Sequence, residues 1–449
     1  MLGFAVGAFY ALSRHPIYGL MTYVAVYYLH PPARWWGAPI AGYRWSLLAA
    51  GITLLAVIIH ARKRQPPTVP LFKHKVMIGL MLFFGWLVLQ SFSALDQPMH
   101  HDMITLFAKY VLLVGLIYLS VDSERHLKWF LWTHVLGCAY LGWIAYTAYE
   151  GGRFEGFGGP DINEANAGAL QIVTGILCAS VLLLMGKTKE RLFLLGTLPF
   201  IVNALVTTVS RSGFLEVALG GIVFNWFSLP RFKKIVRVLS IVAVLGFLVV
   251  TDPGYWLRIS SMKYAGEQVQ GVDTGEGRIV LVKAQWQMFF AHPFGCGHRC
   301  TAVLSPEYLD DSRLTGQGKQ RARSSHNSFM TMLVEHGVVG ALFYVALLVW
   351  IYRSVRFLAR KLKGQETFLA AFMPAIAAIM AALTIGDLFV DYVLQEVRMW
   401  FVAILMVCVS LASALPKAPP AEADTKKEVP KRLPKPRRRL QEVTTVERR

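Results

Sequence analysis

The chain has 449 residues, of which 55% are hydrophobic and 12% are aromatic, and its mean hydropathy is +0.45. This composition is far too apolar for a soluble protein of this length. A formal net charge of +19 would indicate nucleic-acid binding in a soluble domain, but most of the basic residues lie in short links between apolar stretches. The sequence therefore predicts an integral membrane protein without a nucleic-acid partner.

Apolar stretches recur along the chain, and each is long enough to cross a hydrocarbon core of ~30 Å. They predict an all-α, polytopic fold with about twelve transmembrane helices. The stretches are residues 16–29, 37–59, 76–92, 103–120, 129–148, 167–186, 192–209, 214–229, 235–251, 337–352, 368–385 and 392–415. Residues 1–12 are also apolar, but they lack the basic start and the small-residue cleavage site of a signal peptide, so we expect them to form part of a first hairpin or an extended first helix.

The basic links predict the orientation of the chain in the membrane. Residues 60–75, 186–191, 231–234 and 353–363 fall on one side if each stretch crosses once. The positive-inside rule makes that side the cytoplasm. The tail, residues 416–449, reaches the same side and is too polar and too rich in Pro, Lys and Arg to build a core. We expect it to be disordered and to act near anionic lipid rather than at a specific partner site.

Four parts follow from this topology: transmembrane helices in 1–251, a periplasmic loop in 252–327, further transmembrane helices in 328–415, and the tail. In the loop, apolar residues recur at helical spacing along "GEGRIVLVKAQWQMFFAHPFGCG". This pattern predicts an interfacial helix with Arg278 in its first turn, ended by His292 and Pro293.

The segment "RSSHNSFMTMLVEHG" predicts a second interfacial helix, capped by Asn327 or Ser325 and continuing without a break into the next crossing. Its apolar face is Phe329, Met332, Leu333 and His336. Glu335 is expected off that face. His326 would then lie at the helix N-terminus, at the outer aqueous edge of the bundle.

Three basic residues occupy positions suited to chemistry. Arg211 lies in "TTVSRSGFLEVALG", in a short link between two crossings, while Arg278 and His326 each begin a helix of the outer loop. Arginine is the residue of choice for phosphate, and histidine can accept a proton near pH 7. The set suits a lipid-linked diphosphate attacked by an acceptor hydroxyl. The structural alternative, in which each residue only snorkels, caps or is solvated, is equally compatible with any one residue taken alone.

Three segments, "SRSGFL", "GEGRIVLVKAQWQMFFAHPFGCG" and "HNSFMTMLVEHGVVGALFY", resemble in order and topology the signatures of the bacterial O-antigen ligase and O-antigen polymerase superfamily. The resemblance covers roughly residues 149–400, and the histidine segment is its most specific part. "GPDINEANAGAL" resembles the Asn-rich entry to an earlier crossing. The opening "RHPIYGLMTYVAVYYLHPPARWWG" resembles the branch of O-glycosylation ligases associated with exosortase systems.

The resemblance implies a GT-C-like glycosyltransferase of the bacterial inner membrane that uses no metal, nucleotide sugar or other cofactor. It would move a glycan from undecaprenyl diphosphate to a hydroxyl of a glycan, lipid or protein acceptor on the periplasmic side. The pathway would be that of O-antigen and lipopolysaccharide, exopolysaccharide or protein O-glycosylation, with ligase and polymerase both open. By position, Arg211 and Arg278 would hold the diphosphate, and His326 would orient or deprotonate the acceptor.

Further polar residues are weaker candidates for substrate binding. Asp161, Asn163 and Asn166 are placed to contact sugar hydroxyls, although capping the crossing that begins near residue 165 is favoured. Asn327 is a candidate beside the histidine. Arg323 would help to attract the anionic donor.

Charged residues near the last crossing, and two cysteines, have structural alternatives. Asp387 and Asp391 are a second carboxylate source, solvated loop residues or partners of Arg398, while Glu396 and Arg398 are first interpreted as a pair. The remaining feature is "GCGHRC", with Cys296, His298 and Cys300. Three donors without a visible fourth favour a disulfide or two free thiols over a metal site.

The main rival is a transporter or flippase for an anionic or lipid-linked solute. Such a protein would place charged features near the midplane and show repeated halves, whereas here the polar features gather at one face and no repeat is visible. A non-catalytic scaffold for polysaccharide export is a third alternative, and it would need none of Arg211, Arg278 or His326.

Overall fold

The structure, a computed structural model, describes the chain except residues 64–65, 251–275, 315–321, 326, 392–394 and 417–449, and it leaves out the side chains of 243, 247–250 and 276–278. The described residues fold into helices and contain no strand. The all-α prediction is therefore confirmed. The predicted disorder of the tail lies outside the described residues.

The helices follow one another with short links. They are α1 (Leu2–Ser13), α2 (Ile17–Leu29), α3 (Trp45–Ile59), α4 (Lys75–Gln90), α5 (Gln97–Ser120), α6 (Glu124–Ala148), α7 (Ala165–Met185), α8 (Thr188–Thr207), α9 (Arg211–Phe227), α10 (Lys233–Val250), α12 (Glu276–Ala291), α13 (Cys300–Tyr308), α14 (Ser328–Glu335), α15 (Gly337–Lys361), α16 (Phe368–Gly386) and α17 (Glu396–Ala414). Short 3-10 helices are Pro31–Ala33, Ala38–Ile40, Leu71–Lys73 and Asp311–Arg313.

A helix occupies each of the apolar stretches predicted to cross the membrane. Within the described residues, six helices are long and apolar enough to do so: α5, α7, α8, α15, α16 and α17. Several of the others, including α3 and α4, are apolar but shorter. The chain is thus a polytopic helical membrane protein, while the count of about twelve crossings and the GT-C-like architecture stay predictions.

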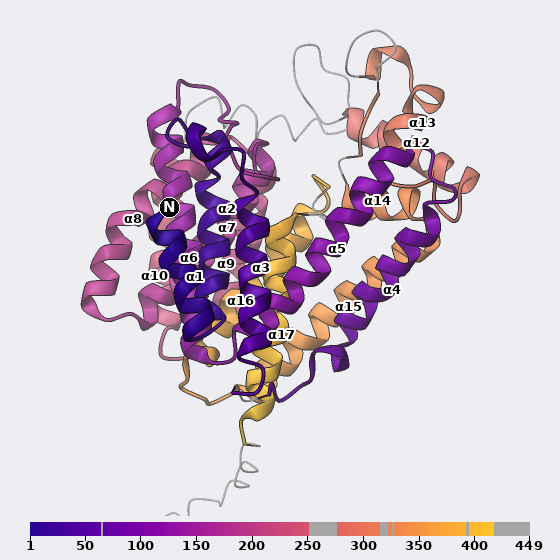
Figure 1. Cartoon of the computed structure of the whole chain (residues 1–449). Helices are drawn as coiled ribbons and strands as arrows, with labels where there is room; N and C mark the ends of the chain where they lie inside the picture. Colours follow the sequence, from indigo (N-terminus) through magenta and orange to yellow (C-terminus); the bar gives the residue numbers. More distant parts are fainter. Residues whose placement is uncertain (64–65, 251–275, 315–321, 326, 392–394, 417–449) are drawn as a thin grey trace, which may run out of the picture. The chain divides into compact units, whose positions relative to one another are not determined.

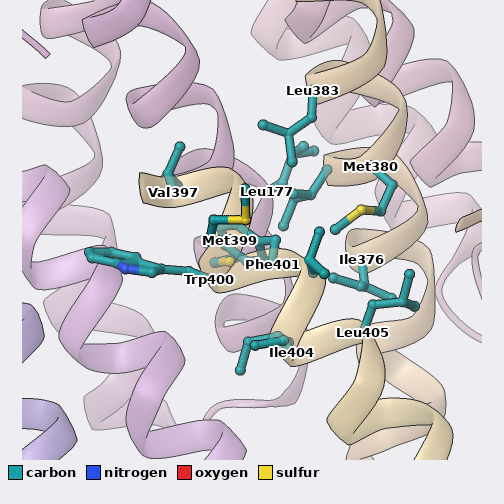
Figure 2. Close-up of a cluster of buried hydrophobic side chains, with 14 of the residues drawn as sticks. Leu177, Ile376, Met380, Leu383, Val397, Met399, Trp400, Phe401, Ile404 and Leu405 are labelled. Carbon is teal, nitrogen blue, oxygen red and sulfur yellow. The ribbon is translucent and has the colours of Figure 1, made fainter. Parts of the chain in front are cut away.

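The core is built around α16 and α17, which are apolar all round apart from the first turn of α17. A helix of this kind is buried on all sides, and 78% of the apolar window of each is buried. Figure 2 shows Phe401 and Leu405 of α17 among Ile376 and Met380 of α16, with Leu177 of α7 beside them. By contrast α15, almost as apolar, has only 22% of its window buried, so much of its surface faces away from the bundle.

The loop helices gather at one end of the described bundle. Figure 1 shows α12, α13 and α14 together at the upper right, beside one end of α4 and α5, while the C-terminal end of α17 lies at the opposite end of the view. The predicted helix containing Arg278 is confirmed as α12, which ends one residue before His292. Among the described residues proposed for the site, Arg278 lies in α12, Arg211 begins α9, Arg323 and Asn327 precede α14, Asp161 and Asn163 precede α7, and Asn166 lies in the first turn of α7.

Candidate functional site

The start of α9 is fixed by hydrogen bonds around the residue before Arg211. The Ser210 hydroxyl accepts from the Gly213 amide at 3.1 Å and donates to Asn166 Oδ1 at 2.8 Å. Ser210 is therefore the N-cap, and Arg211 is the first residue of the helix. The unpaired amides of a helix N-terminus carry a partial positive charge, so Arg211 adds a full charge to a position that already favours anions.

The start of α14 is held in a similar way. Asn327 Oδ1 accepts from the Met330 amide at 3.0 Å, which confirms the predicted cap. The Ser328 amide donates to the Asp387 carbonyl at 2.8 Å, and its hydroxyl donates to the Val390 carbonyl at 3.0 Å. These bonds fix the residues next to His326 against the end of α16.

A buried ion pair lies beneath this junction. Arg398 of α17 forms a salt bridge with Asp387, whose other carboxylate oxygen accepts from the Tyr344 hydroxyl at 2.6 Å. Glu216, one turn and a half along α9 from Arg211, is fully buried and interacts electrostatically with Asp387. Helix α16 therefore packs against α9, and the Asp387 carbonyl at its end holds the start of α14 through the Ser328 amide.

The ionisable residues of α17 have partners other than those first expected. Glu396 accepts from the Tyr23 hydroxyl at 2.8 Å and from Trp400 Nε1 at 3.0 Å, whereas Arg398 pairs with Asp387. The predicted pairing of Glu396 with Arg398 is wrong, because residues two apart leave a helix in different directions. The alternative pairing of Asp387 with Arg398 is confirmed.

A second polar cluster lies where the loop after α12 crosses the end of α14. Cys296 and Cys300 form a disulfide around His298, which confirms the favoured interpretation of "GCGHRC". His298 Nδ1 lies 3.1 Å from Glu335 Oε2, and the Arg299 amide donates to that oxygen at 2.8 Å. Glu335 was expected off the buried face, but it is only 4% exposed because it accepts these loop donors.

The helix containing Glu335 also breaks where a continuous helix was expected. Gly337 has a φ of +67°, a left-handed conformation that ends α14 and starts α15 in a new direction. The Gln90 side chain closes the break by donating to the Glu335 carbonyl at 2.8 Å. The prediction of an unbroken helix from 328 into the crossing is therefore wrong.

Burial and charge make the second cluster electrostatically unusual. Burial and the Glu335 carboxylate together raise the pKa of Asp391 to about 7, although His298 opposes the rise. For His298, burial lowers the pKa, but the hydrogen bond and charge of Glu335 outweigh it and leave the pKa raised. His298, Glu335 and Asp391 thus share a small, poorly solvated volume.

The remaining predicted site residues have varied positions. His326 lies outside the described residues, and Arg278 is the third residue of α12, with its side chain also outside the described part. Arg323 Nη1 donates to the Arg313 carbonyl at 3.1 Å, within the loop. The structure therefore does not report the mutual distances of the three basic residues.

Asp161, Asn163 and Asn166 do not cap α7. The N-cap of α7 is Glu164, without a side-chain bond. Asn163 Oδ1 instead accepts from the Gly158 amide at 2.9 Å, and Asn166 binds Ser210. Asp161 is exposed and accepts from the Tyr110 hydroxyl at 3.1 Å. The capping prediction is wrong, because these side chains fold the loop and join it to α5 and α9.

Sequence reasoning missed the part that His336 and Gln90 play in the second cluster. Their contact joins residues far apart in the chain, with His336 Nδ1 2.8 Å from Gln90 Oε1. A polar Gln90 at the end of an otherwise apolar stretch, and a second histidine directly after Glu335, were the available signals.

Comparison with known proteins finds one family model that matches part of the chain. Residues 195–345 match the family model described as O-Antigen ligase, a segment that contains Arg211, Arg278 and His326. No curated protein matches the chain. A family of this kind carries out glycan transfer of the ligase or polymerase type. The match over residues 195–345 therefore supports the resemblance to the O-antigen ligase and polymerase superfamily.

Proposed function

We propose that the protein transfers a glycan from an undecaprenyl-diphosphate-linked donor to an acceptor hydroxyl on the periplasmic face of the bacterial inner membrane. The observation that carries the proposal is the family match over residues 195–345, which spans all three basic residues. The start of α14, held beside the end of α16 by the bonds of Ser328, and the packing of α9 against α16 support it.

The chemistry assigns different roles to the basic residues. The bond between the anomeric carbon and the diphosphate oxygen breaks, and a bond to the acceptor oxygen forms. Arg211 and Arg278 would stabilise the negative charge that remains on the diphosphate. His326 would orient the acceptor hydroxyl and take its proton. No step of this scheme needs a metal or a nucleotide sugar.

Two other residues are proposed to contact substrate. Asp161 is exposed in the loop before α7, where its carboxylate can accept from a sugar hydroxyl. Arg323 precedes the α14 cap and adds positive charge near His326. Asn163, Asn166 and Asn327 have the structural bonds described above, so any contact they make with glycan would be additional to those bonds.

Reconstitution in vesicles with lipid-linked glycan and acceptor, without nucleotide sugar or added metal, tests the proposal. Loss of a charge-assisted bond costs ~1.5–3 kcal/mol, so Arg211→Ala and Arg278→Ala should lower transfer by roughly 10- to 150-fold each. Lysine should restore only part, since it keeps the charge but not the planar fork. His326→Ala should lower the rate by about 10² to 10⁴ while donor binding persists.

The matched control is Arg353→Ala, in a basic link after the apolar part of α15, which should leave transfer unchanged. Near-wild-type transfer by the three site variants, at equal amounts of inserted protein, would reject the shared site. Donor movement across the vesicle membrane without any product would favour the transporter alternative.

The proposed orientation has its own test. Gly318→Cys and Lys426→Cys, probed with an impermeant thiol reagent in intact cells, should react at residue 318 only. The background is low, because Cys138, Cys178 and Cys408 are buried and Cys296 is bonded to Cys300. Reaction at residue 426 alone would invert the topology.

A further inference from the structure

We propose that His298, Glu335 and His336, with Asp391 beside them, bind one divalent transition-metal ion of the zinc class. One donor atom of each of the first three residues lies within 4.8 Å of a donor atom of the other two. The side chains of His298 and Glu335 are 17% and 5% exposed, and His336 is buried. We call these four residues the junction cluster, because they lie where the loop after α12 meets the break between α14 and α15.

The hydrogen bonds of Gln90 fix the tautomer of His336. Gln90 Nε2 donates to the carbonyls of Phe294 and Glu335 at 3.2 and 2.8 Å. Carbonyls only accept, so the amide orientation is determined, and Oε1 must accept from His336 Nδ1 at 2.8 Å. The lone pair of the neutral ring is therefore on Nε2. A ring held by Nδ1–H, with Nε2 available, is the arrangement that metal-binding histidines have.

His298 and Glu335 are already about as far apart as two ligand atoms on the same metal ion. Ligand atoms around tetrahedral zinc, with bonds of ~2.0–2.1 Å, lie about 3.3 Å apart. His298 Nδ1 and Glu335 Oε2 are 3.1 Å apart. Because all three donors already lie within 4.8 Å of one another, small side-chain rotations would complete the set.

Asp391 supplies an independent observation. Its Oδ1 is buried and has no hydrogen-bond partner within the described part of the chain. Glu335 is close enough for its charge to act on Asp391. Two carboxylates near each other in a poorly solvated volume repel, and a bound cation would remove that repulsion. Asp391 is thus the nearest candidate for a fourth ligand.

The donor set selects the class of ion. Two imidazoles with carboxylates suit zinc and its neighbours, whereas magnesium and calcium prefer oxygen donors alone. His100 is not a ligand, because its Nδ1 accepts from the His298 amide at 3.0 Å and its Nε2 binds the Leu87 carbonyl at 2.8 Å. The metal would fasten the loop to the α14–α15 break, a structural role independent of the proposed glycan transfer.

A second cluster of histidines with a carboxylate does not carry the same argument. This cluster is His15, Asp122 and His126. One oxygen of the Asp122 carboxylate pairs with the His15 ring at 3.0 Å, and the other pairs with the His126 ring at 2.6 Å. Asp122 therefore has no oxygen left over, unlike Asp391. This trio is nevertheless removed in the experiment below, since it is the other place in the described residues where an ion would find three donors.

The test is a Co²⁺ titration of the full chain, purified with a tag that contains no histidine and treated with a chelator. In the background His15→Gln with His126→Gln, we expect about one Co²⁺ per chain, with the visible absorption of a four-coordinate ion, displaced by Zn²⁺. His298→Gln, at a partly exposed position, should weaken binding by at least about 10-fold. His101→Gln, in α5 and exposed, is the matched control and should bind as the background does.

Co²⁺ binding by the His15→Gln, His126→Gln protein tests the proposal, and no buried residue needs to be replaced. Absence of Co²⁺ binding there, or binding that is unchanged in His298→Gln, overturns the proposal. Glycan transfer is not a readout of this titration, so its failure is separate from a failure of the proposed function.

Discussion

The α16–α17 core and the junction cluster both bury ionisable side chains, but they satisfy them differently. In the core, Arg398 has Asp387, and Asp387 also has Tyr344. In the junction cluster, Asp391 has a buried oxygen without a partner among the described residues, and His336 presents a nitrogen lone pair. We call the first set closed, because its charged groups have partners within it, and the second open, because it includes a buried oxygen that has no partner among the described residues.

This difference separates structural from functional polarity. A closed pair uses its hydrogen bonds internally, so removing one member leaves an uncompensated charge in an apolar region. In an open set the desolvation of the buried polar groups is not offset until a ligand binds to them. Groups of this kind are therefore candidates for ligand sites. Four predictions test which of the polar and special residues described above contribute mainly to stability.

The largest effect is expected from opening the closed pair. Arg398→Met should destabilise the protein by about 3–5 kcal/mol, because Asp387 would stay buried without its cation. Unfolding by denaturant in mild detergent measures the loss. Arg398→Met combined with Asp387→Leu should recover most of it, and a double variant as unstable as the single one would contradict the pairing argument.

The second-largest loss of stability is expected at Gly337, in the break before α15. Gly337→Ala forces a side chain into a left-handed conformation, at a cost of about 1–3 kcal/mol, and the new Cβ would lie 2.2 Å from the Phe294 carbonyl carbon. Faster proteolysis of the loop after α12 should accompany the loss of stability. Gly364→Ala is the control, since Gly364 has a φ of +77° but open space around it. Equal losses in the two variants would show that contact with the loop contributes nothing.

The Asn327 cap should contribute about 1 kcal/mol, the usual cost of replacing an N-cap by alanine. Asn327→Ala should therefore lower the unfolding temperature slightly, and Asn327→Ser should restore it. The same pair tests a role in substrate binding: if Asn327 contacts the glycan, serine will restore stability but not transfer. Restoration of both properties would leave Asn327 as a cap alone.

The smallest effect is expected at Asp122, in the link between α5 and α6. Burial raises its pKa, but hydrogen bonds to His126 and His15 outweigh this and hold the pKa well below its usual range. The associated stability is present above the unfolded pKa of about 4 and is lost as the pH falls through the folded pKa. At pH 7, Asp122→Asn should cost about 1 kcal/mol or less.

Unfolding measured between neutral and acidic pH checks this sign. The wild type should lose stability more steeply than Asp122→Asn below about pH 4. Parallel curves for the two proteins would mean that Asp122 pairs equally well in the unfolded state.

Much of the fold was predictable because it depends on local pattern. Apolar length located a helix at each expected crossing, helical spacing located α12, and a single asparagine located the start of α14. The disulfide was one of two alternatives that the cysteine spacing left open, the other being two free thiols.

The errors concern partners that the tertiary structure chooses. Glu335 was placed on a polar face because its neighbours in sequence are apolar, yet its partners come from the loop around His298. Asp387 and Glu396 illustrate the same limit, since charge and spacing left several pairings open. The geometry of Arg211, Arg278 and His326 stays a prediction, because the position of His326 lies outside the described residues.

The all-round burial of α17 has a consequence for how the protein is made. The helix packs against α5, α15 and α16, yet it is synthesised after all three. Until it is inserted, Asp387 lacks its cation and the surfaces that will face α17 are open. A nascent chain released before residue 396 therefore presents a carboxylate that has its Tyr344 hydrogen bond but lacks its cation, a chemical difference between the unfinished and the finished protein.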